Sequence, residues 1–171
     1  MARQLNEKET KTVKLIERIL ADEMRAKPEV SGMLGDLQLK PYTVGDKSVQ
    51  ILVVSVKEDL LRFLRKNYRE FLTAMKKEFP GMVILATRNE KAPEKKGLAL
   101  NRKREALLND LCFPAVVMGR SQEVESRTEV VQNVYLDAKQ SYWSDNEMKA
   151  IQCLAAQILK DKFEFKLFAT E

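Results

Sequence analysis

The chain has 171 residues, 44% of them hydrophobic, and apolar runs such as Ile51–Val54 are far too short to cross a bilayer. It contains no histidine, which excludes mechanisms that need an imidazole base, a Ser-His or Cys-His pair, or a histidine-ligated metal. The formal net charge is +5, and the two cysteines, Cys112 and Cys153, lie far apart without C-x-x-C spacing, so we expect an anionic partner, a reducing compartment and two buried thiols.

A helix and a hairpin are predicted at the start of the chain. Asn6 followed by Glu9 is typical of a capping box, and the helix extends over about residues 6–27, where a Lys-Pro pair ends it. Its apolar stripe consists of Val13, Ile16, Leu20 and Met24. Two extended segments, 37–44 and 49–56, flank a Gly-Asp-Lys turn, which predicts a β-hairpin whose second strand is buried.

A long amphipathic helix over residues 57–79 follows the hairpin and ends at a Pro-Gly pair. Its apolar side consists of Leu61, Leu64, Tyr68, Phe71, Met75 and Phe79. Residues 82–87 then form another apolar run typical of a buried strand. Strand, helix and strand in this order predict a β-α-β crossover with parallel strands.

The second half of the chain predicts a short helix over 101–111, extended runs over 114–125 and 127–136 with a turn at Ser126, and a capped helix after Ser144. The alternation over 163–167 is typical of a half-buried edge strand. Phe113 precedes a proline, so we expect the chain to turn there and bury the ring. The fold class is therefore α+β: a single domain over residues 1–171 with a mixed sheet, a β-α-β crossover, packing helices and a basic loop extension.

The positive charge is concentrated in one segment, residues 88–104. This segment holds seven basic and two acidic side chains, a net +5 that equals the charge of the whole chain. Pro93, Gly97 and the lack of apolar periodicity before Leu98 predict an exposed loop. Its cations suit a phosphate backbone, because they release condensed counterions; the alternative is a solvated linker. The candidate binding residues are Arg88, Lys91, Lys95, Lys96, Arg102, Lys103 and Arg104.

Other features leave two interpretations open. The polar side of the helix over 57–79 carries Arg62, Arg65, Lys66 and Arg69, which could track a phosphate backbone or be a solvated face. Tyr142 and Trp143 could stack on a base or pack onto the helix after Ser144. Nucleotide-binding, hydrolase, metalloprotease and single-strand RNA-binding motifs are all missing from the sequence, so we expect no enzyme activity, no cofactor and no bound metal.

One series of motifs is more specific. Residues 106–114 read Ala-Leu-Leu-Asn-Asp-Leu-Cys-Phe-Pro, followed by Gly119-Arg120, Val-Tyr-Leu-Asp at 134–137 and Lys-Asp-Lys-Phe-Glu-Phe at 160–165. Residues 69–81 and 83–88 add a long-helix signature and its following strand. In order and spacing the chain resembles the seventh eukaryote-specific protein family of the small ribosomal subunit, from about Leu34 onward.

The resemblance implies a structural protein of the cytoplasmic ribosome, without catalysis, that binds small-subunit rRNA and joins during nucleolar assembly. Residues 88–104 match the family's Lys/Arg-rich rRNA-binding loop, which here is shorter and less basic. Arg120 and the helix cations Arg62, Arg65, Lys66 and Arg69 are secondary candidates. Expected partners are small-subunit rRNA, neighbouring small-subunit ribosomal proteins and assembly factors, with no membrane. The alternative is a free-standing RNA-associated adaptor or translation regulator.

Overall fold

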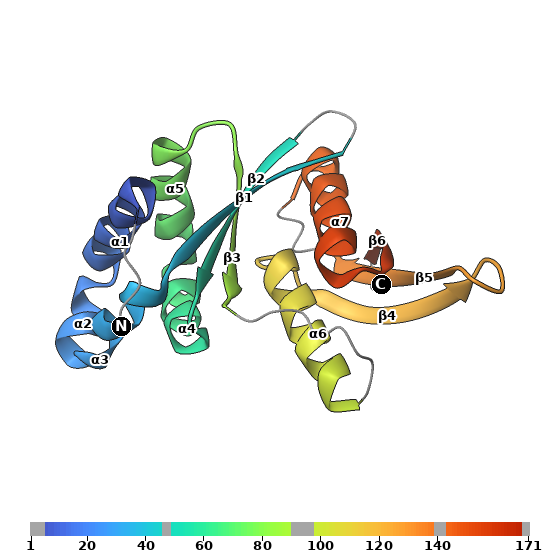
Figure 1. Cartoon of the computed structure of the whole chain (residues 1–171), viewed down its shortest axis with the longest axis horizontal. Coiled ribbons are helices and arrows are strands. Elements are labelled where there is room, and N and C mark those ends of the chain that lie inside the picture. The colour runs from blue at the N-terminus through green and yellow to red at the C-terminus, as the bar shows by residue number, and fades with distance from the viewer. Residues whose placement is uncertain (1–5, 46–48, 90–97, 139–142, 169–171) are drawn as a thin grey trace. The chain divides into compact units, whose positions relative to one another are not determined.

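The structure is a computed structural model that describes residues 6–45, 49–89, 98–138 and 143–168 (Figure 1). The chain divides into two compact units: the first unit is residues 1–42 and 50–90, and the second unit is residues 43–49 and 91–171. Within the described ranges, no helix has the length and apolar character needed to span a membrane.

The first unit begins with helices that cap and pack locally. They are α1 (Glu7–Ile19), α2 (Ala21–Ala26), α3 (Glu29–Met33) and the 3₁₀ turn η1 (Leu34–Asp36). The predicted capping box is confirmed, since the Asn6 side chain accepts a hydrogen bond from the Glu9 amide at 2.8 Å. Ile16 and Leu20 of the predicted stripe are buried. The helix expected over 6–27 is interrupted, however, because α1 ends before Leu20, whose φ of −96° departs from helical geometry.

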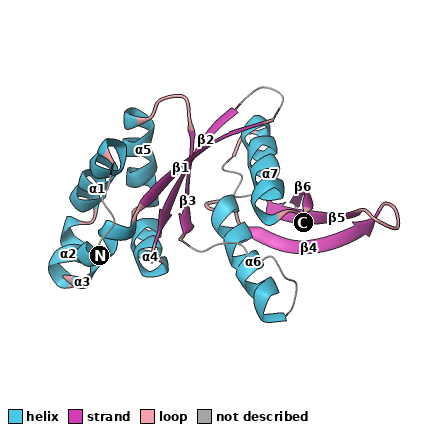
Figure 2. Cartoon of the chain, in the orientation of Figure 1, coloured by secondary structure: helices cyan, strands magenta, loops and turns pink. Residues whose placement is uncertain are grey.

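The sheet of the first unit has the order β1-β2-β3, with β1 (Gln38–Val44), β2 (Val49–Val56) and β3 (Val83–Arg88) (Figure 2). Strands β2 and β3 are parallel, with Ile51 opposite Val83 and Val56 opposite Arg88. Helices α4 (Glu58–Lys66) and α5 (Tyr68–Glu78) lie between them in the chain. The predicted β-α-β crossover is therefore confirmed.

The long helix predicted over 57–79 is wrong in one respect, because it is two helices that meet at Asn67. The Asn67 side-chain amide donates to the Glu23 carboxylate at 3.0 Å and to the Phe63 carbonyl at 3.4 Å. Asparagine side chains compete with the backbone in this way and interrupt helices. The predicted apolar stripe still forms the core, since Leu64 and Phe71 are fully buried.

The second unit contains α6 (Leu98–Cys112), β4 (Val117–Val124), β5 (Val130–Asp137), α7 (Asp145–Leu159) and β6 (Lys162–Phe168). Its sheet has the order β4-β5-β6. Strands β4 and β5 are antiparallel, with Arg120 opposite Val134, whereas β5 and β6 are parallel. The predicted turn at Ser126 is present, and its hydroxyl accepts hydrogen bonds from the amides of Thr128 and Glu129.

Helix α7 organises the core of the second unit. Ser144 and Glu147 form the predicted capping box, and the stripe of Ile151, Leu154 and Leu159 is buried. Trp143 is only 5% exposed, and its indole N–H donates to the Cys112 carbonyl at 2.9 Å. Trp143 is therefore a core residue in this structure rather than an exposed base-stacking platform.

The sheets and the start of helix α6 differ from what the sequence predicts. The strands form two three-stranded sheets rather than one mixed sheet, although the α+β class is confirmed. Helix α6 starts at Leu98 instead of residue 101. The prediction of a single domain over residues 1–171 is not tested by the division into two units and stays a prediction.

Two side chains are also more exposed than predicted. Phe113, expected in the core, is half-buried, while the neighbouring Leu111 and Cys112 are buried. Cys153 is exposed because it lies two residues from Ile151 and one from Leu154, off the buried stripe of α7. Of the two predicted buried thiols, only Cys112 is buried.

Candidate nucleic-acid interface

Helix α6 holds three of the candidate phosphate-binding cations in consecutive positions. Arg102 and Lys103 are exposed, whereas Arg104 is half-buried. The difference follows from helical geometry, since Arg104 precedes the buried Leu108 by four residues and Leu111 by seven. Arg102 and Lys103 therefore point to solvent from a regular helix rather than from a loop.

Arg104 is bound within the second unit. Its guanidinium donates to the Leu159 carbonyl and to the Asp161 carboxylate, and the Arg104 and Asp161 side chains are only 13% and 20% exposed. Leu159 is the last residue of α7, so Arg104 satisfies a carbonyl that the helix itself leaves unpaired. Arg104 was predicted to be one of the exposed phosphate-binding cations, but its contacts connect α6 to the end of α7.

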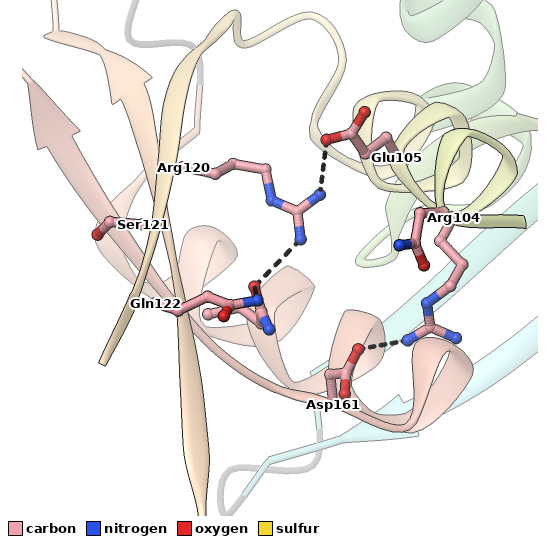
Figure 3. A pocket seen from close by; sticks show the side chains of 8 residues that line it. Arg104, Glu105, Arg120, Ser121, Gln122 and Asp161 are labelled. Atoms are coloured by element: carbon pink, nitrogen blue, oxygen red, sulfur yellow. Dashed lines mark hydrogen bonds and ion pairs between the residues drawn. The ribbon is translucent and has the colours of Figure 1, made fainter. Parts of the chain in front are cut away.

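Arg120 of β4 faces α6 across a polar hollow of about 330 Å³ (Figure 3). Its guanidinium donates to the Glu105 carboxylate at 3.3 Å and to the Gln132 side-chain oxygen at 3.4 Å. We call this hollow the α6–β4 hollow; its lining residues are Asn101, Arg104, Glu105, Arg120, Ser121, Gln122, Gln132 and Asp161. The structure thus brings Arg104 and Arg120 to the walls of one hollow in the second unit.

The candidate cations of the first unit have their own contacts. Arg88, 16% exposed, pairs with Glu58 at 3.4 Å. Arg62 is 69% exposed and pairs with Glu58 at 3.5 Å and Asp59 at 3.9 Å. The exposed Arg62 pairs contribute at most about 1 kcal/mol and leave that guanidinium accessible, whereas the Arg88 side chain is mostly covered.

The remaining cations of this helix pair differ in their surroundings. The Lys66 ammonium lies 5.4 Å from the centre of the Phe63 ring, and Lys27 lies 5.5 Å from the same ring. Arg69 is exposed on α5, and Arg65 is half-buried on α4. This face therefore presents Arg62, Lys66 and Arg69 to solvent, interleaved with Glu58, Asp59 and Glu70.

Three candidates, Lys91, Lys95 and Lys96, lie outside the described residues. Among the residues that are described, no group of three or more metal-ligating side chains comes together. The Cys112 thiol is also unsuited to chemistry, because burial raises its pKa from 9.0 to about 12 against a smaller lowering effect of Arg120. The described candidate residues can therefore bind a partner through charge and hydrogen bonds.

Three residues of the α6–β4 hollow were not identified from the sequence: Gln122, Gln132 and Asp161. Gln122 and Gln132 lie directly opposite each other in the antiparallel register, and the Gln122 amide donates to the Gln132 oxygen at 3.3 Å. The alternation of the hairpin could have placed Arg120, Gln122 and Gln132 on one face. Asp161 lies in the Lys-Asp-Lys-Phe motif, but its contact with Arg104 spans 57 residues and carries no local signal.

Comparison with known proteins identifies relatives over most of the chain. The chain is 27% identical over 133 residues to the small ribosomal subunit protein eS7 of Avicennia marina, covering 71% of this chain and 70% of the relative. It is 26% identical to eS7z of Arabidopsis thaliana, covering 70% and 68%. It is 30% identical over 136 residues to eS7 of Encephalitozoon cuniculi, covering 77% and 76%. No family model matches the chain.

These relatives are all proteins of the small ribosomal subunit, and they place the chain in that class of protein. The chain belongs to the eS7 family. The resemblance found in the sequence motifs is therefore confirmed.

Proposed function

We propose that this chain is a structural constituent of the small ribosomal subunit that binds small-subunit rRNA through the cations of residues 88–104. The observation that carries the proposal is the pair of exposed cations, Arg102 and Lys103, on a regular helix. A helix holds such side chains in a fixed direction, so less conformational entropy is lost when they meet phosphates. The contacts position the backbone and do not read the base sequence.

The cations divide between two roles. Arg102 and Lys103, with Lys91, Lys95 and Lys96, contact phosphates directly. The other three cations remain in their ion pairs, which are Arg88 with Glu58, Arg104 with Asp161 and Arg120 with Glu105. These pairs hold in place the helices and strands that carry the phosphate-binding cations. Arg62, Lys66 and Arg69 form a second, weaker phosphate-binding face, since the carboxylates between them reduce its positive field.

The protein acts without catalysis, on the cytoplasmic ribosome, after entering the small subunit during nucleolar assembly with the help of assembly factors. Its neighbours are other small-subunit ribosomal proteins. Family membership supports this setting. The alternative is an RNA-associated adaptor or translation regulator, and co-sedimentation separates the two, because a structural protein stays with small subunits through a salt wash whereas an adaptor leaves.

The test of the phosphate contacts is an alanine pair, Arg102→Ala with Lys103→Ala, in the full chain. We expect weaker binding to purified small-subunit rRNA, and a slope of log K against log salt that is flatter by about 0.7–0.9 for each phosphate that the variant no longer neutralises. The matched control is Arg62→Ala with Lys66→Ala, which removes the same charge from α4 and should change the slope less. An unchanged slope in the α6 pair would contradict the proposal.

A further inference from the structure

The α6–β4 hollow is a half-open surface depression with a polar lining. It lies within the second unit, between the first half of α6 and the face of the β4–β5 hairpin that carries Arg120, Gln122 and Gln132 (Figure 3). Its volume of about 330 Å³ exceeds that of a single nucleobase. Such a volume is in the range of small-ligand sites, in which a few convergent polar groups fix the orientation of the ligand.

A chain of hydrogen bonds fixes how these polar groups point. Glu105 accepts from Arg120, and Arg120 donates to the side-chain oxygen of Gln132. That oxygen also accepts from the Gln122 amide nitrogen at 3.3 Å. Because Arg120 can only donate, the Gln132 oxygen must face it, and because that oxygen can only accept, Gln122 must offer its nitrogen.

The consequence is a defined donor and acceptor pair at the hollow. The Gln132 side-chain nitrogen and the Gln122 side-chain oxygen take no part in this chain of bonds, which sets the orientation of both amide groups through the shared Gln132 oxygen. One amide donor and one amide acceptor, from two side chains on the same face of the hairpin, are the types of group that hydrogen-bond the polar edge of an unpaired nucleobase. The hollow is therefore organised to read a polar edge.

The charges of the hollow argue against a phosphate as its occupant. Arg104 is compensated by Asp161, and Arg120 by Glu105. A phosphate in the hollow would be repelled by the carboxylates of Asp161 and Glu105. It would also find no unpaired guanidinium to attract it, because each carboxylate already neutralises one. A neutral base carries no such cost, and its polar edge finds partners in the amides. The phosphates belong instead with the exposed Arg102 and Lys103, two or three residues along α6 from Glu105.

We infer that the α6–β4 hollow binds one unpaired base of the RNA whose backbone lies along Arg102 and Lys103, with Gln122 and Gln132 contacting its edge. The inference rests on the proposed function, because the helix cations bring the RNA to the hollow. Proteins recognise RNA sequence mainly in loops and bulges, where bases are unstacked and their edges accessible. The hollow then adds base selectivity to an interface whose cations supply only positioning.

The test compares base and backbone protection of purified small-subunit rRNA by the full chain. Dimethyl sulfate and a carbodiimide report on base edges, and hydroxyl radicals report on the backbone. The variant is Gln122→Leu with Gln132→Leu, which keeps the side-chain size and removes the donor and acceptor. Its matched control is Gln157→Leu, an exposed glutamine of α7. Trp143 fluorescence checks that the second unit keeps its core.

We expect the parent chain and Gln157→Leu to protect at least one unpaired base together with the neighbouring backbone. The double variant should lose that base protection and bind about tenfold more weakly, with the slope of log K against log salt unchanged. Equal base protection by the double variant and the parent would overturn the inference and leave the proposed function standing. If the parent protects neither bases nor backbone, the proposed function fails and the inference fails with it.

Discussion

Strand β2 of the first unit and strand β4 of the second unit differ in how much of each is buried. In the first unit, β2 is buried at every position from Ile51 to Val56. In the second unit, β4 is exposed at every position after Val117. A wholly buried strand stabilises the fold through its side chains. An exposed strand with polar side chains stabilises it mainly through backbone pairing, so its side chains remain available to bind a partner.

One ion pair from each unit shows a second difference in exposure. In the first unit, Lys11 of α1 reaches Glu78 of α5, and these side chains are 56% and 41% exposed. In the second unit, Arg104 of α6 reaches Asp161 after α7, and these side chains are only 13% and 20% exposed. Water screens the second pair less than the first. The Arg104–Asp161 pair is therefore a largely buried polar contact of the second unit, and both residues also line the α6–β4 hollow.

The largest effect is expected in the core of the first unit. Phe71 is fully buried, so Phe71→Ala should lower the free energy of unfolding by about 3–5 kcal/mol through reduced burial and a residual cavity. Urea denaturation followed by circular dichroism measures the change. Phe113→Ala is the comparison in the second unit, and it should cost less because that ring is only half-buried.

The same variant tests the single-domain prediction. Trp143 is the single tryptophan of the chain and lies in the second unit, so its fluorescence follows that unit while circular dichroism follows both. In a single cooperative domain, Phe71→Ala shifts both transitions together. A tryptophan transition that stays at its original urea concentration would mean that the two units unfold independently.

A smaller effect is expected when the contact between α6 and α7 is removed. Arg104→Ala takes away the guanidinium that donates to the Leu159 carbonyl and the Asp161 carboxylate, and should cost roughly 1.5–3 kcal/mol. The control is Arg62→Ala, whose pairs are exposed and whose removal should cost less than about 1 kcal/mol. Thermal or urea unfolding of both variants checks the difference. Equal losses of stability would mean that the Arg104 contacts are no stronger than surface pairs.

These contacts also separate what the sequence could predict from what it could not. Local patterns were sufficient for both capping boxes, the buried β2 strand and the stripe containing Leu64 and Phe71. The interruption at Asn67 was missed: the side-chain bond of Asn67 to the Phe63 carbonyl is local, but its shorter bond to Glu23 spans 44 residues and has no local signal. The ion pair of Arg104 was not predictable either, since the helix position of Arg104 is local but its partner Asp161 is 57 residues away. The α6–β4 hollow required the hairpin register and the packing of α6 together.

The two capping boxes allow the same change to be made in each unit. Asn6 accepts from the Glu9 amide at 2.8 Å in the first unit, and Ser144 accepts from the Glu147 amide at 3.2 Å in the second. Asn6→Ala and Ser144→Ala should each cost about 1 kcal/mol. Asn6→Asp and Ser144→Asp retain an acceptor and should cost less. If the units unfold independently, Ser144→Ala shifts the Trp143 transition and Asn6→Ala does not.

A clear chemical contrast is expected between the two thiols. Cys112 is buried, with its pKa raised to about 12, and Cys153 is exposed. At pH 8 a bulky thiol reagent should therefore modify one cysteine of the native chain and both after denaturation, because only a thiolate that the reagent can reach will react. Cys153→Ser should abolish the native reaction, and Cys112→Ser should leave it unchanged.

The raised pKa of Cys112 also fixes the sign of a pH effect. Well below pH 9.0, the ordinary pKa of the thiol, Cys112 is protonated in both the folded and unfolded chain and does not influence the equilibrium. Above pH 9.0 the unfolded chain loses this proton first, so the free energy of unfolding falls until the folded thiol ionises near pH 12. Urea denaturation of Cys112→Ala at pH 8 and pH 10 should show a weaker pH dependence than the parent chain. An identical pH dependence would mean that the Cys112 thiol ionises in the folded chain as readily as it does in the unfolded one.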